Sequence, residues 1–127
     1  MSYSFNKVLD CSFEEAITKV TEQLAREGFG VLTEIDISAT LKKKLDVDFR
    51  KYKILGACNP HFAYQALQSE ADIGTMLPCN VVVQETEQGV KVSAIDPVAS
   101  MMAVNNDSLV GVATEVRTKL EKVVDTL

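Results

Sequence analysis

Hydrophobic residues recur along the chain with two periods, one helical and one extended. Residues 3–9 alternate loosely and predict a first strand, whereas residues 29–37 alternate strictly and predict a second strand with one strongly apolar face. Between them, a capping box at Ser12 and a glycine at position 28 bracket a predicted helix. Its apolar positions share one face: Phe13, Ala16, Ile17, Val20 and Leu24.

The middle of the chain predicts a short helix, a strand and a longer helix. Ser38 is a suitable N-cap for a helix over residues 39–45. Residues 50–57 predict the third strand, with an apolar run that begins near Tyr52 and ends at Leu55. Residues 59–71 then keep the spacing of apolar positions that is typical of a helix.

The last third of the chain predicts a hairpin followed by helices. Residues 79–84 and 90–94 flank a polar turn and predict an antiparallel hairpin. Residues 98–104 predict one or two helical turns, and Asn106-Asp107-Ser108 caps a final helix that ends near Leu127. This order of elements predicts a single α+β domain over residues 1–127, with a mostly antiparallel sheet and helices packed on one face.

Composition narrows the classes of function. The chain has 127 residues, of which 46% are hydrophobic and 24% are charged, and its net charge is −5. This net negative charge argues against a nucleic-acid partner and against electrostatic docking on an anionic membrane. No apolar run is long enough to span a bilayer, and the first residues do not read as a signal peptide. We therefore expect a cytoplasmic protein whose three cysteines are reduced.

Residues 54–61, Ile-Leu-Gly-Ala-Cys-Asn-Pro-His, bring a thiol, an imidazole and a predicted helix N-terminus closest together in the sequence. Asn59 suits an N-cap and Pro60 the first helical position, so a strand should lead directly into a helix here. Cys58 would then lie beside a helix N-terminus, which favours the thiolate. His61 is the only histidine and so the only candidate for a general base at neutral pH. Cys58 and His61 are therefore candidate catalytic residues, and inert packing of Cys58 is the alternative.

Other residues could complete a ligand site around this turn. Cys58, His61 and Cys79 are soft ligands that suit zinc or copper, although a structural zinc site usually has four ligands. Asn59 and Asn80 could hydrogen-bond a small molecule. Asp96 could add a carboxylate at the end of the hairpin, although Asp-Pro is mainly a turn signal.

Two further groups of residues have both a functional and a structural interpretation. A basic cluster could hold an anionic small molecule or nucleotide, or it could simply form a solvated helix face and a protected edge strand. Three methionines could line an adaptable pocket or a subunit interface, or they could belong to the core. The basic cluster comprises Lys42, Lys43, Lys44, Arg50, Lys51 and Lys53, and the methionines are Met76, Met101 and Met102.

The run from Tyr52 to Pro60 resembles the central motif of the bacterial and archaeal family known as domain of unknown function 302. The similarity continues through residues 77–83 and 95–97 and spans essentially the whole chain. It implies a small α+β fold, often paired as a homodimer, and no established activity. The residues that match motif positions of the family are Cys58, Asn59, Pro60, Cys79, Asn80, Asp96 and Pro97.

Two hypotheses about function follow. In the first, the protein binds a small molecule or metal through the Cys/His site and has a thiol-linked or redox-linked role, with catalysis left open. In the second, it is a non-catalytic homodimeric binding or interaction module in which Cys58 is purely structural. The exposed face of the sheet would then form the dimer or bind a partner.

Overall fold

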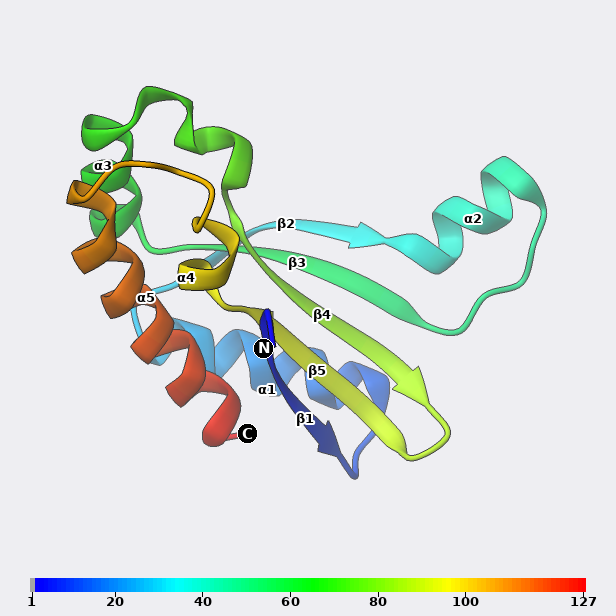
Figure 1. Cartoon of the computed structure of the whole chain (residues 1–127). Helices are drawn as coiled ribbons and strands as arrows, with labels where there is room; N and C mark the ends of the chain where they lie inside the picture. The colour runs from blue at the N-terminus through cyan, green and yellow to red at the C-terminus, as the bar shows by residue number, and fades with distance from the viewer. Residues whose placement is uncertain (1) are drawn as a thin grey trace.

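The fold is built on one five-stranded sheet, seen here in a computed structural model that describes residues 2–127. Its order is β1-β5-β4-β3-β2, and every neighbouring pair is antiparallel (Figure 1). The predicted α+β class is confirmed. The strands are β1 (Ser4–Leu9), β2 (Gly30–Asp36), β3 (Tyr52–Cys58), β4 (Cys79–Thr86) and β5 (Gly89–Ile95).

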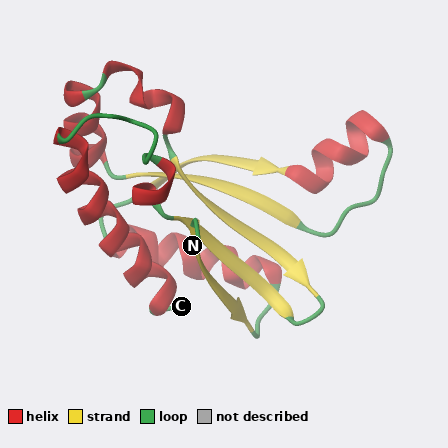
Figure 2. Ribbon diagram, in the orientation of Figure 1, coloured by secondary structure: helices red, strands yellow, loops and turns green. Residues whose placement is uncertain are grey.

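The longer helices gather on one side of the sheet, as Figure 2 shows. Helices α1 (Phe13–Arg26) and α5 (Ser108–Asp125) pack on the strands, and α3 (Pro60–Ser69) packs beside α5. No helix among residues 2–127 is long and apolar enough to cross a lipid bilayer. Three shorter elements complete the chain: α2 (Ile37–Leu45), the 3₁₀ helix η1 (Ala71–Met76) and α4 (Pro97–Ser100).

The main core lies between the sheet and α1 and α5. Alternate residues of the central strands point into it, because successive side chains of a strand point to opposite faces. The helices contribute the apolar faces that their spacing predicted. Fully buried members include Leu55, Val81, Val83 and Val92 from the strands and Val20, Leu24 and Leu120 from the helices.

The second predicted strand is present, but most of its apolar face is not buried. Phe29, just before β2, is buried, but within the strand Ile35 is 46% exposed and Leu32 is 67% exposed. The reason is position, because β2 is the edge of the sheet and its far end runs beyond the helices (Figure 1). Sequence alternation cannot show which stretch of a strand is covered.

Helix α2 and the loop after it, residues 37–51, protrude from the body of the molecule, and we call this segment the arm. Asp36 caps α2, since its Oδ1 accepts a hydrogen bond from the Ala39 backbone N–H at 2.9 Å. The predicted cap, Ser38, instead donates its hydroxyl to Asp36 at 2.8 Å. No residue of α2 is fully buried, and the helix packs only lightly, against β3.

One further boundary differs from the prediction. Helix α4 is a single turn that Asp96 caps, and it ends at Ser100 rather than at Val104. Helix α5 begins at Ser108 as predicted; the side chain of Asp107 at its N-cap makes no capping bond, and Oδ1 of Asn106 accepts from the Ser108 backbone N–H at 3.0 Å. Side-chain oxygens of Asp and Asn compete for nearby backbone N–H groups, so the cap residue is hard to choose from sequence.

Candidate functional site

The predicted turn from strand to helix is confirmed. Strand β3 ends at Cys58, helix α3 begins at Pro60, and Asn59 lies between them at the N-cap. On the sheet, Cys58 pairs with Gly30 of β2, and its neighbour Ala57 pairs with Cys79 of β4. The ladder therefore brings Cys58 and Cys79 to adjacent positions on neighbouring strands.

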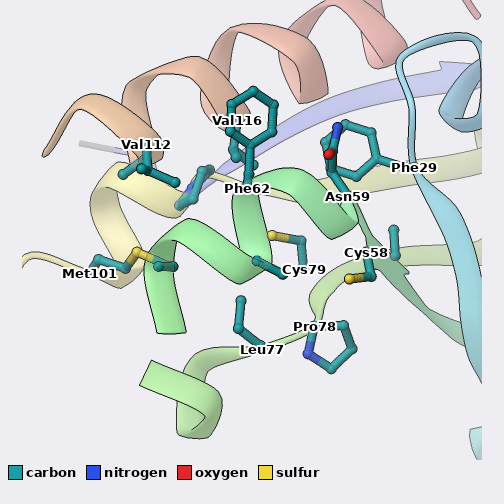
Figure 3. A pocket seen from close by; sticks show the side chains of 15 residues that line it. Phe29, Cys58, Asn59, Phe62, Leu77, Pro78, Cys79, Met101, Val112 and Val116 are labelled. Carbon is teal, nitrogen blue, oxygen red and sulfur yellow. The ribbon is translucent and has the colours of Figure 1, made fainter. Parts of the chain in front are cut away.

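A small apolar pocket of about 30 Å³ lies at this turn, between α3, α4, α5 and the ends of β3 and β4. Figure 3 shows Cys58, Asn59 and Cys79 around it, with Met101 and Val112 on its far side. A volume of this size holds about one water molecule. The other labelled lining residues are Phe29, Phe62, Leu77, Pro78 and Val116.

Asn59 has a different role from the one expected of it. It occupies the N-cap but its side chain makes no capping hydrogen bond. Instead its Nδ2 donates to the backbone oxygen of Glu27 at 3.3 Å. Glu27 is the C-cap of α1, so this buried amide joins the end of one helix to the start of another. Pro60 begins α3 as predicted.

The two thiols of the pocket differ in burial. Cys58 is half-buried, whereas Cys79 is only 8% exposed. Burial, and to a smaller extent the neighbouring Cys58, raises the pKa of Cys79 to about 11. The Cys79 thiol therefore stays protonated near neutral pH. All three cysteines are free thiols.

The structure does not gather Cys58, His61 and Cys79 into a set of metal ligands. His61 is exposed on the first turn of α3 and is not part of the pocket lining. Over residues 2–127, no group of three or more His, Cys, Asp or Glu side chains is placed to hold a metal ion. His61 lies close to Cys58 in the sequence, but its side chain faces solvent instead of the thiols.

The other predicted ligand residues lie apart from one another. Asn80 is exposed on the opposite face of the sheet from Cys79, as strand alternation requires. Asp96 is 6% exposed and already has partners. Its Oδ1 accepts from the Val98 backbone N–H at 2.9 Å, and its Oδ2 pairs with Nε of Arg117 at 3.1 Å. Asp96 thus stabilises the start of α4 and its contact with α5.

The sequence predicted an exposed face of the sheet, which we call the open face, but did not show which residues form it. A hollow of about 430 Å³ lies on it, lined by residues that include Tyr52, Asn80, Val82, Ser93 and Ile95. Alternation within β3 and β4 was the available signal, because residues between the buried positions must point to the other side. The signal was hidden by the continuous apolar run in each strand.

An apolar groove of about 200 Å³ adjoins the pocket between α4 and α5. Met101 and Ala113 line both the pocket and the groove. Of the three methionines of interest, Met102 lines only the groove, and Met76 packs in a small core cluster around Ile73 and Leu109. The predicted methionine-lined pocket therefore corresponds to Met101 and Met102.

The family model of Domain of unknown function DUF302 matches residues 5–127. The chain belongs to the DUF302 family. A crystal structure of an uncharacterized conserved DUF302 protein from Bacillus stearothermophilus is similar to it, with a TM-score of 0.91 and 27% sequence identity over 98% of each chain. No curated protein matches this DUF302 chain. The resemblance seen in the sequence is confirmed, and it extends to the whole fold.

Proposed function

We propose that this DUF302 protein is a non-catalytic homodimeric binding module whose two copies meet through the open face and the arm. The observation that carries the proposal is a row of apolar side chains on the open face beside an arm helix with no buried residue. Three free thiols, including the half-buried Cys58, further support a cytoplasmic location.

The row runs across the sheet at one level. Ile35 pairs with Ile54, Ile54 with Val82, and Val82 with Ser93. Side chains at paired positions point to the same face, so the first three form a continuous apolar strip. An antiparallel sheet that faces water on one side normally carries polar residues there. The strip is therefore better suited to contact with protein than with solvent.

The arm carries apolar side chains of its own. Leu45 is 65% exposed, Val47 is 43% exposed and Phe49 is 40% exposed. Such a cluster at the end of a protruding segment is typical of an interaction site. In an isologous dimer each copy contributes the same surfaces, so the arm of one copy can lie on the open face of the other.

Charge favours a second copy as the occupant. The arm carries a net +3, and because the whole chain carries −5, the remainder carries −8. Within the arm, Lys42 pairs with Asp46 and Asp48, whereas Lys43 and Lys44 form no ion pair with residues 2–127. A basic arm on an acidic body is attracted to the body of another copy.

The oligomeric state tests this proposal. Sedimentation equilibrium should show a dimer for the wild type, and Ile54→Asp or Leu45→Asp should weaken it at least about tenfold, because a charge would be buried in the interface. Leu67→Asp is the matched control, since Leu67 is 45% exposed on α3, outside the proposed interface. A wild type that stays monomeric at all concentrations, or equal weakening by Leu67→Asp, would contradict the proposal.

A thiol-linked function is the second candidate, and the position of Cys58 favours it. This half-buried thiol lies immediately before a helix N-terminus and lines the pocket. The test is its alkylation rate by iodoacetamide in the native protein at neutral pH. A rate well above that of glutathione supports a chemical role for Cys58, and a rate at or below it leaves Cys58 as a structural residue.

A further inference from the structure

We propose that the hollow of the open face binds a small organic anion, held by Arg50, Gln84 and Lys91. The anionic group would lie on these three side chains, and the apolar body of the ligand would lie on Val82. The site is built from one copy, so it goes beyond the proposed dimer and does not depend on it.

Strand register brings several hydrogen-bond donors together at one edge of the hollow. Tyr52 pairs with Gln84, and Gln84 pairs with Lys91, so the three side chains form a row across β3, β4 and β5 on the open face. The row lies next to the apolar strip, because Gln84 follows Val82 by two residues in β4. A hydroxyl, a carboxamide and an ammonium group can thus donate to one ligand.

Arg50 extends this row from the arm. Its Nε donates to Oε1 of Gln84 at 3.0 Å, and its Cζ lies 4.3 Å from the centre of the Phe49 ring. This contact leaves the Gln84 side chain with its NH₂ group to offer. The terminal nitrogens of Arg50 make no hydrogen bond with residues 2–127, and such a guanidinium edge suits the oxygens of a carboxylate or a phosphate.

The charges at the hollow select an anion. Neither Arg50 nor Lys91 forms an ion pair with residues 2–127, whereas Lys51 and Lys53 of the basic cluster each pair with a glutamate. No Asp or Glu of the described residues lines the hollow. Lys91 is half-buried, so its attraction to an anion is less screened by water than that of a fully exposed lysine.

The rest of the hollow has room and apolar surface for the body of the ligand. Its volume of about 430 Å³ is of the size found in small-molecule sites, and Val82 and Ile95 add half-buried apolar surface beside the ring of Tyr52. An aromatic ligand could stack on that ring. Most of the lining comes from β1, β4 and β5, so a second copy that lies on Ile35 and Ile54 does not need to fill the hollow.

The test is an NMR titration with benzoate at constant ionic strength that follows the Gln84 side-chain amide and the backbone amides of Tyr52 and Lys91. We expect saturable shifts of all three signals. Benzyl alcohol, which has the ring but no charge, should cause no saturable shift at the same concentrations. Phenyl phosphate carries the other anionic group that a guanidinium binds well, and it should compete with benzoate for the same signals.

Variants locate the site within the molecule. Lys91→Gln should weaken benzoate binding about tenfold, because one charge-assisted hydrogen bond is lost, and Lys91→Arg should retain it. Arg50→Gln gives a second loss of charge if Lys91→Gln folds poorly. Lys19→Gln is the matched control, since Lys19 is exposed on α1, which packs on the other face of the sheet. The titration is repeated on Leu45→Asp, where binding should persist even if the dimer is lost.

Three results would overturn the inference. Benzoate shifts that do not saturate, or equal shifts with benzyl alcohol, would exclude an anion site. Equal weakening by Lys91→Gln and Lys19→Gln would show only a response to net charge. Loss of binding in folded Leu45→Asp would show that one copy does not build the site, whereas a monomeric wild type that binds benzoate would contradict the dimer alone.

Discussion

Gly56 shows why the central motif contains a small residue. A Cβ atom built at this position would lie 2.7 Å from Cγ of Pro78 and would also meet the Thr33 hydroxyl. The glycine therefore accommodates the Thr33 side chain of β2 and the Pro78 side chain just before β4. At this residue the motif serves packing.

Gly56→Ala should accordingly destabilise the protein by about 1–3 kcal/mol, because the added methyl group forces Thr33 and Pro78 apart. Gly30→Ala is the matched control in the adjacent strand, since nothing lies within 4 Å of a Cβ added there. Urea denaturation of both variants measures the difference. Equal midpoints for the two would show that the sheet relaxes around the extra methyl.

Cys79 is the residue whose protonation is most altered by the fold. Its thiol has a pKa of about 11 in the folded state, against a reference value of 9.0. Between these two values the unfolded chain has lost the proton and the folded chain retains it. The folded state then binds more protons than the unfolded state, so this group makes stability fall as pH rises.

The free energy of unfolding of the wild type should therefore decrease between pH 9 and pH 11 more than that of Cys79→Ala, by at most about 3 kcal/mol. Denaturant titrations of both proteins across this range measure the difference, and other titrating groups cancel because they are shared. Parallel pH profiles would mean that the thiol is not protected from ionisation by the fold.

The helix caps show that local sequence predicts roughly where a helix starts but not which group the cap side chain bonds. Ser12 caps α1 as expected, accepting from the Glu15 backbone N–H at 3.1 Å. At the start of α2, however, Asp36 takes the place expected for Ser38, and Asn59 directs its amide to another helix. Local chemistry located the start of each of these helices, but the partner of each polar side chain depended on tertiary neighbours.

Two aspartate caps with similar local geometry should differ in their contribution to stability. Asp96→Ala should cost about 2 kcal/mol, because it removes both the α4 cap and the ion pair with Arg117. Asp36→Ala should cost no more than about 1 kcal/mol, since that cap is exposed at the end of β2, where the arm begins. Thermal or chemical unfolding of both variants gives the comparison, and a larger loss at Asp36 would show that the arm is part of the folding core.

For the whole molecule, the class of fold and most strands and helices could be predicted from periodicity. The relation between distant segments could not. Asn59 and Asn80 both follow pocket cysteines in the sequence, yet one lies in the pocket and the other on the open face. The sequence also could not predict that α2 protrudes, because its apolar residues have the spacing of an ordinary core helix.

The arm should be dispensable for folding. Asp36 and Lys53 are paired residues of β2 and β3, so replacing the arm and Tyr52, the first residue of β3, with Asn-Gly closes the two strands as a tight hairpin. We expect the shortened protein to keep its circular dichroism spectrum and a melting temperature close to that of the wild type, but to be monomeric. Unfolding of this variant, or an intact dimer, would contradict the separate role given to the arm.

The order of the strands also has a consequence for synthesis on the ribosome. Strands β2, β3, β4 and β5 are neighbours in the sheet in the order of the chain, so each can pair with its predecessor as it emerges. Strand β1 pairs only with β5, and Ser4 lies opposite Ile95. The first strand to be made is thus the last to find a partner, and its backbone hydrogen-bonding groups stay unpaired until β5 has been made.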